Sequence, residues 1–223
     1  MPVRIEDVLA QLPEIFSGVQ EIPLKNIRFD PDNPGAPISE EQIQELADDM
    51  DKRGQQNPII GCPDKSNPLA PGVTLHPDNP RLKGDGTPWR LVDFIWRTLT
   101  GEGRSRAAIK LKWETIKGFI KNPTEEEAVK ITYWDNKTRY RGDWWPAYQT
   151  IERLIKANPN LTQEQVGASL GIAIPMVNRA IRLFPLLNSE ARALIITNCN
   201  NSNKGKKGIS EAATVGCNKS LSG

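Results

Sequence analysis

The chain has 223 residues, 38% apolar and 25% charged, within the range of globular proteins. One histidine and three scattered cysteines exclude zinc fingers and Ser-His-Asp or Cys-His sites built from this chain alone, and the lack of a signal peptide or an apolar run of about 18 residues predicts a cytoplasmic protein without a membrane partner. Residues 1–60 hold 5 Lys and Arg against 12 Asp and Glu, whereas the remainder carries a net charge of +9, which favours a polyanion as partner of the later part.

The first part of the chain alternates helix and strand patterns. Ser39 and Gln42 form a capping box before the clearest helix, and Gly54 ends it. The predicted segments are a helix (3–12), an extended segment (19–29), a helix (39–54), a strand (57–62), a long loop (63–88), a strand or bent pair of strands (89–100), a helix (104–111), a strand (115–121) and a helix (124–134). We therefore expect an N-terminal helical arm (1–19) followed by a small mixed α/β domain (20–133).

Strand patterns stop at Trp144, and the sequence then predicts a helix over 144–158. A pair of short helices follows over 161–187, where Thr162 begins the first, Gly171 ends it and Pro175 suits the start of the second. This pattern is typical of a helix-turn-helix. The fold class expected is therefore α+β, with an all-α helix-turn-helix domain (134–197) and a polar, flexible tail (198–223) after the α/β domain.

A helix-turn-helix would place the outward side chains of its second helix on DNA. Asn can pair with adenine, and Arg can pair with guanine or a phosphate. The DNA-binding candidates are Met176, Asn178, Arg179 and Arg182, with Thr162 and Gln163 at the start of the first helix. Ile174 and Pro175, together with Met176, occupy positions that usually carry polar side chains, and an ordinary helical hairpin remains the alternative.

The stretch LTGEGRSRAAIKLKW (99–113) places two glycines between a strand and a helix. Gly101 and Gly103 would let the backbone approach an anion at the positive end of the helix. Arg104 and Arg106 add guanidinium groups suited to phosphate oxygens, and Glu102 would face a metal, a sugar hydroxyl or an arginine. The alternative is an ordinary strand–helix turn with a solvated basic helix.

Four segments, in order, resemble boxes of the ParB partition-protein family. The segment GEGRSRAA resembles the phosphate-binding box G-E-R-R-x-R-A, and DNKTR (135–139) resembles the E-N-x-x-R box. Upstream, IPLKNIRFDPDNP and LADDMDKRGQQNPII resemble the opening strand and the helix that ends in G-x-x-Q-P-I. With the helix-turn-helix, the resemblance covers roughly residues 20–187.

The resemblance implies a ParB/sulfiredoxin-like domain that binds CTP with Mg²⁺, joined to a domain that binds double-stranded DNA, in chromosome or plasmid partition or related regulation. It also implies a homodimer and a partition ATPase as partners. The implied nucleotide-binding residues are Gly101, Glu102, Gly103, Arg104, Arg106, Ala107, Asp135, Asn136, Arg139, Gly54, Asn57 and Pro58. Glu102 and Asp135 would be the metal ligands through Mg²⁺.

The chain departs from the family pattern at three of these positions. Gly103 stands where the family has an arginine, Asn57 where it has glutamine and Asp135 where it has glutamate. Weak CTP hydrolysis therefore stays open, as do two alternatives: a ParB-like metal-dependent nuclease, and a plain helix-turn-helix regulator with a degenerate first domain. Sulfiredoxin chemistry is excluded because no cysteine lies between residues 63 and 198.

Three tryptophans lie among basic residues after the α/β domain: Trp134, Trp144 and Trp145. Aromatic rings interleaved with cations can stack the bases of single-stranded nucleic acid. Packing of these rings between the two domains is the interpretation we favour.

Overall fold

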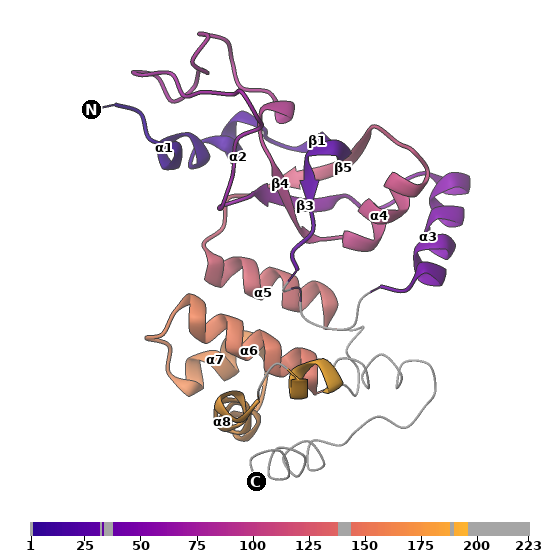
Figure 1. The fold of residues 1–223 in the computed structure, drawn as a ribbon, viewed down its shortest axis with the longest axis vertical. Helices are drawn as coiled ribbons and strands as arrows, with labels where there is room; N and C mark the ends of the chain where they lie inside the picture. The colour runs from indigo at the N-terminus through magenta and orange to yellow at the C-terminus, as the bar shows by residue number, and fades with distance from the viewer. Residues whose placement is uncertain (1, 32, 34–37, 138–143, 188–189, 196–223) are drawn as a thin grey trace. The chain divides into compact units, whose positions relative to one another are not determined.

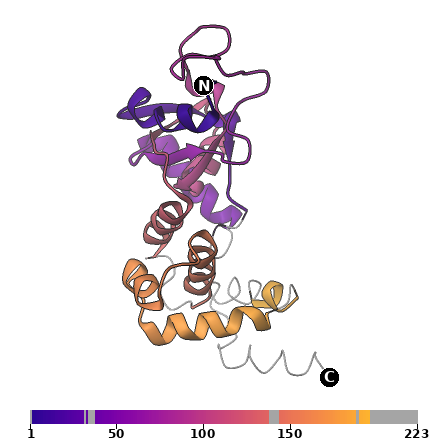
Figure 2. The ribbon, with the colours of Figure 1, turned by 90° about the vertical axis from the view of Figure 1, so that its left-hand side faces the viewer.

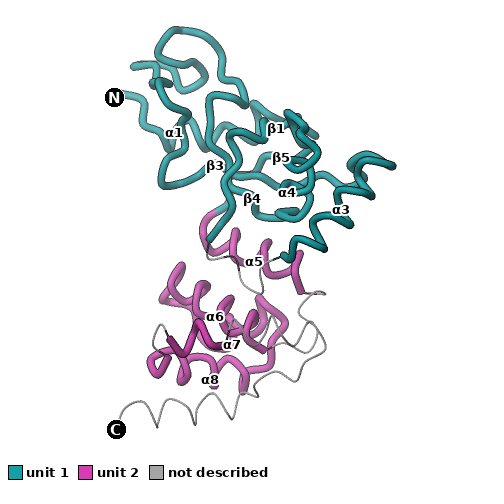
Figure 3. Tube along the Cα trace, turned by 45° about the vertical axis from the view of Figure 1, so that its right-hand side comes forward, with its two compact units in different colours: residues 1–31, 38–123 teal, residues 32–37, 124–223 magenta. Residues whose placement is uncertain are grey.

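The computed structural model describes residues 2–31, 33, 38–137, 144–187 and 190–195. Two compact units divide the chain: residues 1–31 with 38–123, and residues 32–37 with 124–223 (Figure 3). Each unit has its own apolar core. No helix in the described ranges is both long enough and apolar enough to span a bilayer.

A mixed five-stranded sheet organises the first unit (Figure 1). Its order is β1-β5-β3-β4-β2, with antiparallel pairing of β1 to β5 and of β3 to β4, and parallel pairing of β3 to β5 and of β2 to β4. The strands are β1 (Val19–Pro23), β2 (Ile27–Arg28), β3 (Ile59–Pro63), β4 (Trp96–Thr100) and β5 (Thr115–Ile120). The mixture of pairings matches the predicted α/β character, and β3 lies between β4 and β5 at the centre.

Helices α3 (Glu40–Arg53) and α4 (Glu102–Lys110) pack against each other beside this sheet (Figure 1). The predicted capping box is present, because the Ser39 hydroxyl accepts from the Gln42 N–H and the Gln42 side chain accepts from the Ser39 N–H at 3.0 Å. Gly54 ends α3 with φ +69°, in the left-handed half of the map that favours glycine. The helix predicted from about residue 104 begins at Glu102, so only Gly101 of the two glycines lies in the turn.

The N-terminal segment forms two short helices, α1 (Ile5–Leu9) and α2 (Leu12–Ile15), instead of the single predicted helix. Val8 and Leu12 are fully buried and Phe16 is nearly so, and all three belong to the first core. Phe16 meets the rings of Phe94 and Trp96 edge-on, at centroid distances of 6.1 and 6.3 Å. The segment expected as an arm is therefore an integral part of the first unit.

The segment predicted as a long loop extends beyond the sheet on the side of α1 (Figure 1 and Figure 2). Trp89 and Phe94 anchor it to the core with ring centroids 5.0 Å apart, and the Trp89 indole N–H donates to the Pro80 carbonyl. The predicted strand over 89–100 is wrong in its first half. Arg90 and Asp93 cap the short helix η2 (Leu91–Asp93), which delays β4 until Trp96.

The described residues of the second unit form helices. They are α5 (Glu125–Asn136), α6 (Trp145–Ala157), α7 (Gln163–Leu170) and α8 (Ile174–Leu183), followed by η3 (Phe184–Leu186) and a helical turn over 190–195. Their shared core contains Tyr133 of α5, Tyr148 of α6, Leu170 of α7 and Val177 of α8. A mixed α/β unit followed by helices is the fold class that the sequence predicts, and it is confirmed.

Helix α5 belongs to the second unit because its buried face, including Val129 and Tyr133, is part of that unit's core. Thr124 caps it, and Glu127 completes a capping box with it. The units accordingly divide after Pro123, ten residues before the boundary expected at 133/134. The expected tail, 198–223, lies outside the described residues.

Candidate functional site

The turn between β4 and α4 is built around Gly101. Its φ of +81° is in the left-handed region, and a Cβ at this position would lie 2.6 Å from Ile59 Cγ2. The α4 backbone therefore begins directly behind the central strand of the sheet. The first N–H groups of a helix have no partner within the helix and carry its positive end, so this turn fits an anion.

Arg104 connects this turn to the segment that follows α3. Its Nη1 donates to the backbone carbonyls of Asn57 and Pro58, at 2.8 Å for the latter. The structure thus brings together two predicted nucleotide-binding segments, Gly54–Pro58 and Gly101–Ala107. The Gln55 side chain holds the first of these in place by exchanging two hydrogen bonds of 2.7 Å with the backbone of Lys117.

Arg106 already has two partners in the first unit. Its guanidinium donates to Glu102 Oε1 at 2.8 Å and lies over the Phe29 ring, 4.2 Å from the centroid. The Arg106 side chain is 41% exposed, so it is accessible to solvent despite these contacts. Phe29 was not among the predicted site residues. Phe29 directly follows β2, and the parallel pairing of β2 with β4 brings it close to the α4 turn. That pairing is the signal that could have identified it.

Gly103 and Ala107 face the interior of the first unit. A Cβ on Gly103 would lie 3.3 Å from both Ile38 Cδ1 and Leu46 Cδ2, so α4 approaches α3 closely at this point. Ala107 is fully buried in the first core. Their positions account for the helix packing beneath the turn, whereas Arg104 and Arg106 lie toward its surface.

Asp135 and Asn136 lie at the end of α5, in the second unit. Asp135 is exposed and Asn136 is buried, with 6% of its surface accessible. Arg139 lies outside the described residues. Across the described ranges, no group of three or more His, Cys, Asp or Glu side chains is placed to hold a metal ion.

The same end of α5 holds the turn between α7 and α8. The Trp134 indole donates to the Ser169 carbonyl at 3.2 Å, and Lys137 Nζ donates to the Leu170 carbonyl at 3.3 Å. Lys137 also lies over the Trp134 ring at 4.0 Å. Gly171 adopts φ +61°, and a Cβ there would lie 3.1 Å from Lys137 Nζ.

Of the three tryptophans, only Trp134 has an exposed ring, at 50%. Trp145 is 2% exposed within the second core, and Trp144 packs against the same core. Burial leaves Trp145 no face on which a base could stack.

The two helices of the predicted helix-turn-helix are α7 and α8. The Thr162 hydroxyl accepts from the Gln165 N–H, and Gly171 ends α7 in the left-handed conformation, as predicted. The buried side of α8 consists of Val177, Ala180 and Leu183.

The predicted DNA-binding positions differ in exposure. Arg179, Arg182, Thr162 and Gln163 are exposed and Asn178 is half-buried. Met176 is also half-buried, because its side chain packs against the second core. Ile174, at a position that usually carries a polar side chain, is 42% exposed.

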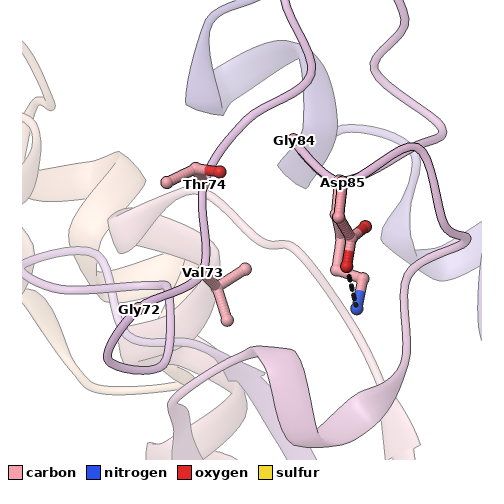
Figure 4. A pocket seen from close by; sticks show the side chains of 6 residues that line it. Gly72, Val73, Thr74, Gly84 and Asp85 are labelled. Carbon is pink, nitrogen blue, oxygen red and sulfur yellow. Dashed lines mark ion pairs between the residues drawn. The ribbon is translucent and has the colours of Figure 1, made fainter.

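A small pocket lies in the segment between β3 and β4 (Figure 4). It has a volume of about 100 Å³ and is lined by Gly72, Val73, Thr74, Lys83, Gly84 and Asp85. Lys83 Nζ lies 3.7 Å from Asp85 Oδ2 and 3.5 Å from the buried Asp93 carboxylate. These ion pairs attach the segment to η2. We therefore interpret the pocket as a consequence of how the loop packs.

Comparisons with known proteins find relatives along most of the chain, although no family model matches it. A chromosome-partitioning protein Spo0J from Thermus thermophilus is 28% identical over 83% of this chain and 58% of its own length. A nucleoid occlusion protein from Bacillus mycoides is 26% identical over 82% of this chain and 53% of its own length. The chain therefore spans only about half the length of these curated relatives.

Solved structures with a similar arrangement include the C-terminally truncated chromosome-partitioning protein ParB from Caulobacter crescentus complexed to the centromeric parS site. It is 18% identical, with a TM-score of 0.45, covering 80% of this chain and 78% of that one. Sulfiredoxin from Arabidopsis thaliana is 22% identical, with a TM-score of 0.29, covering 49% of this chain and 91% of that one. Both TM-scores are too low to decide the fold, which follows from the strands and helices themselves.

Proposed function

From the similarity of this chain to a chromosome-partitioning protein and a nucleoid occlusion protein, together with its resemblance to the boxes of the ParB family, we propose that it is a DNA-binding protein controlled by a nucleotide. The first unit binds CTP with Mg²⁺, and the second unit binds double-stranded DNA through α7 and α8. Nucleotide binding changes how the protein engages DNA during chromosome or plasmid partition or related regulation.

The observation that carries the proposal is the junction of β4 and α4. There Gly101, the N-terminus of a nine-residue helix and the half-buried side chains of Arg104 and Arg106 occupy one turn. Backbone N–H groups and guanidinium forks are the donors that phosphate oxygens prefer. The donor set therefore fits a triphosphate, and the neighbouring segment Gly54–Pro58 would lie on the side of the nucleobase.

Magnesium would neutralise part of the charge of the triphosphate. Glu102 is the carboxylate of the first unit that we assign to it. The assignment of Asp135, Asn136 and Arg139 to the nucleotide rests on their resemblance to the E-N-x-x-R box. In the structure Glu102 accepts a hydrogen bond from Arg106 at 2.8 Å. A phosphate that takes over Arg106 would free the Glu102 carboxylate for the metal ion. Phe29 would keep the Arg106 guanidinium in place during this exchange.

Isothermal titration of the full chain with CTP and Mg²⁺ tests the nucleotide site. We expect saturable binding of CTP and none of ATP. Arg106→Ala should abolish it, because the variant removes a phosphate donor at an accessible position. Arg81→Ala is the matched control: Arg81 is an exposed arginine of the same unit that pairs with Glu14, far from α4 in sequence. Equal CTP binding by Arg106→Ala and by the unaltered chain would contradict the proposed site.

A second candidate function is a helix-turn-helix regulator whose first unit has lost nucleotide binding. Two observations favour it: Arg106 is paired with Glu102, and Gly103 stands where the family box has an arginine. Retention of the chain on duplex DNA, measured with and without CTP, separates the two functions. DNA binding that CTP leaves unchanged would support the second.

A further inference from the structure

The beginning of α8 exposes apolar side chains to solvent. Ala173, Ile174 and Pro175 are all exposed, and Ile174 exposes 42% of its surface. The rest of the helix surface is cationic, because Arg179 and Arg182 are exposed and the sequence has no acidic residue between 171 and 187. This helix therefore combines an apolar end with positive charge.

Helical periodicity places three of these side chains in one row. Ile174, Asn178 and Arg182 follow one another at intervals of four residues, opposite the buried side formed by Val177, Ala180 and Leu183. Ile174 and Arg182 are separated by about 12 Å along the helix axis. The row thus presents, in order, an aliphatic group, an amide and a guanidinium.

The chemistry of a DNA groove limits what can face an aliphatic side chain. The major-groove edges of the bases offer hydrogen-bond donors and acceptors and a single kind of apolar group, the 5-methyl group of thymine. An isoleucine at this position cannot hydrogen-bond to a base edge, so it discriminates only by contact with that methyl group. The arginines suit the phosphates that flank the groove.

We propose that Ile174 is a specificity-determining residue that contacts the 5-methyl group of one thymine in the bound DNA. The inference rests on the proposed function, since it requires α8 to lie in the major groove. The positive charge of the same surface favours DNA over an apolar protein partner, which would have to cover Arg182 in the same row as Ile174.

The test begins by selecting a binding site for the full chain from a random pool of duplexes. Each thymine of that site is then replaced singly by deoxyuridine, which lacks only the 5-methyl group. For the unaltered chain we expect the replacement of one thymine to matter, with a loss of affinity of about fourfold, the value of one buried methyl group. For Ile174→Ala the same replacement should have no effect.

Two further arms sharpen the result. With 5-methylcytosine at that position, which carries the methyl group, part of the lost affinity should return. With cytosine, which lacks it, none should return. Leu186→Ala, at a residue of the second unit that is 56% exposed, should keep the full discrimination.

The possible failures differ. Equal affinity for thymine and deoxyuridine at every position, or an equal loss in Ile174→Ala, would overturn the role of Ile174 while leaving DNA binding intact. Self-association that Ile174→Ala abolishes, without any change in DNA preference, would identify a second copy as the occupant of this surface. Failure to bind any duplex would overturn the proposed function as well.

Discussion

Gly101 combines a left-handed backbone with a close contact to a neighbouring side chain, and both favour glycine over any amino acid with a Cβ. Its φ is +81°, and its Cα faces the Ile59 side chain so closely that a Cβ would lie 2.6 Å from Cγ2. Left-handed backbone at a residue with a side chain and overpacking of a core each cost about 1–3 kcal/mol. The turn that carries the proposed phosphate site therefore depends on this glycine for stability as well as for access.

We expect Gly101→Ala to lower the free energy of unfolding by about 2–4 kcal/mol, since strain and overpacking add. Gly18→Ala is the control, because Gly18 also has a positive φ, of +74°, but nothing lies within 4 Å of its added Cβ. That variant should lose only about 1 kcal/mol. Urea unfolding followed by tryptophan fluorescence measures both. Equal losses of unfolding free energy in the two variants would show that a Cβ at position 101 fits beside Ile59 without a packing cost.

Residue-level chemistry at the α4 turn was predictable only in part. The motif identified Arg104 and Arg106, whose types suit phosphate whatever the fold. An arginine was one of the three partners predicted for Glu102, and the structure selects Arg106. The contact of Arg106 with Phe29 was not predicted, because it depends on the pairing of β2 with β4.

At the level of elements, a bidentate ion pair fastens the last described helical turn to α6. Arg192 donates to both carboxylate oxygens of Glu152 at 2.8 and 3.1 Å. It also donates to the carbonyls of Leu187 and Phe184. Burial raises the pKa of the Glu152 carboxyl, but the hydrogen bonds and charges of Arg192 and Lys156 outweigh it, so the pKa lies below the ordinary value of 4.5.

A carboxyl with a lowered pKa stabilises the folded state above its unfolded-state pKa and loses this effect as the pH falls through the folded-state pKa. Arg192→Ala should therefore be less stable by about 1–2 kcal/mol at pH 7. The difference from the unaltered chain should shrink once the pH falls below about 4.5. Lys156→Ala, which removes an exposed partner of the same carboxylate, should change stability little. Thermal unfolding between pH 3 and 7 checks this; a difference independent of pH would rule out the ion pair as its source.

Elements with strong local signals were predicted well. The capping box of Ser39 and the glycine after α7 mark helix ends where the structure has them. Elements set by distant contacts were not. The 89–100 segment is apolar enough for a strand throughout, yet the Asp93 side chain accepts from the Arg90 N–H and closes η2 first.

At the scale of the whole molecule, acidic and basic residues are concentrated in different parts of the chain. The acidic excess lies in residues 1–60, before the turn at Gly101, and the basic excess follows it. On α8 the exposed charges are Arg179 and Arg182. The proposed DNA interface would therefore gain its affinity through release of counterions.

Binding of the full chain to duplex DNA should weaken steeply as salt increases. Arg182→Ala should reduce the slope of the logarithm of affinity against the logarithm of salt concentration by about 1, because one phosphate contact is lost. Arg81→Ala, in the first unit, should leave the slope unchanged. Fluorescence anisotropy at five salt concentrations measures the slopes. An unaltered slope for Arg182→Ala would place this arginine away from the phosphates.

The order of the units along the chain was predictable from alternating patterns followed by helices alone. The grouping of α5 with the second unit was not, because its sequence fits either neighbour. Burial of Val129 and Tyr133 in the second core decides it. As a result, the predicted nucleotide-binding residues come from two units, and only those of the first were predictable as one contiguous surface.

The close approach of α4 to α3 at Gly103 also limits which side chains this position can hold. A Cβ there would already lie 3.3 Å from both Ile38 Cδ1 and Leu46 Cδ2, so any side chain requires these two to give way. A designed Gly103→Arg variant, which would carry the arginine of the G-E-R-R-x-R-A box, therefore calls for smaller side chains at positions 38 and 46 as well.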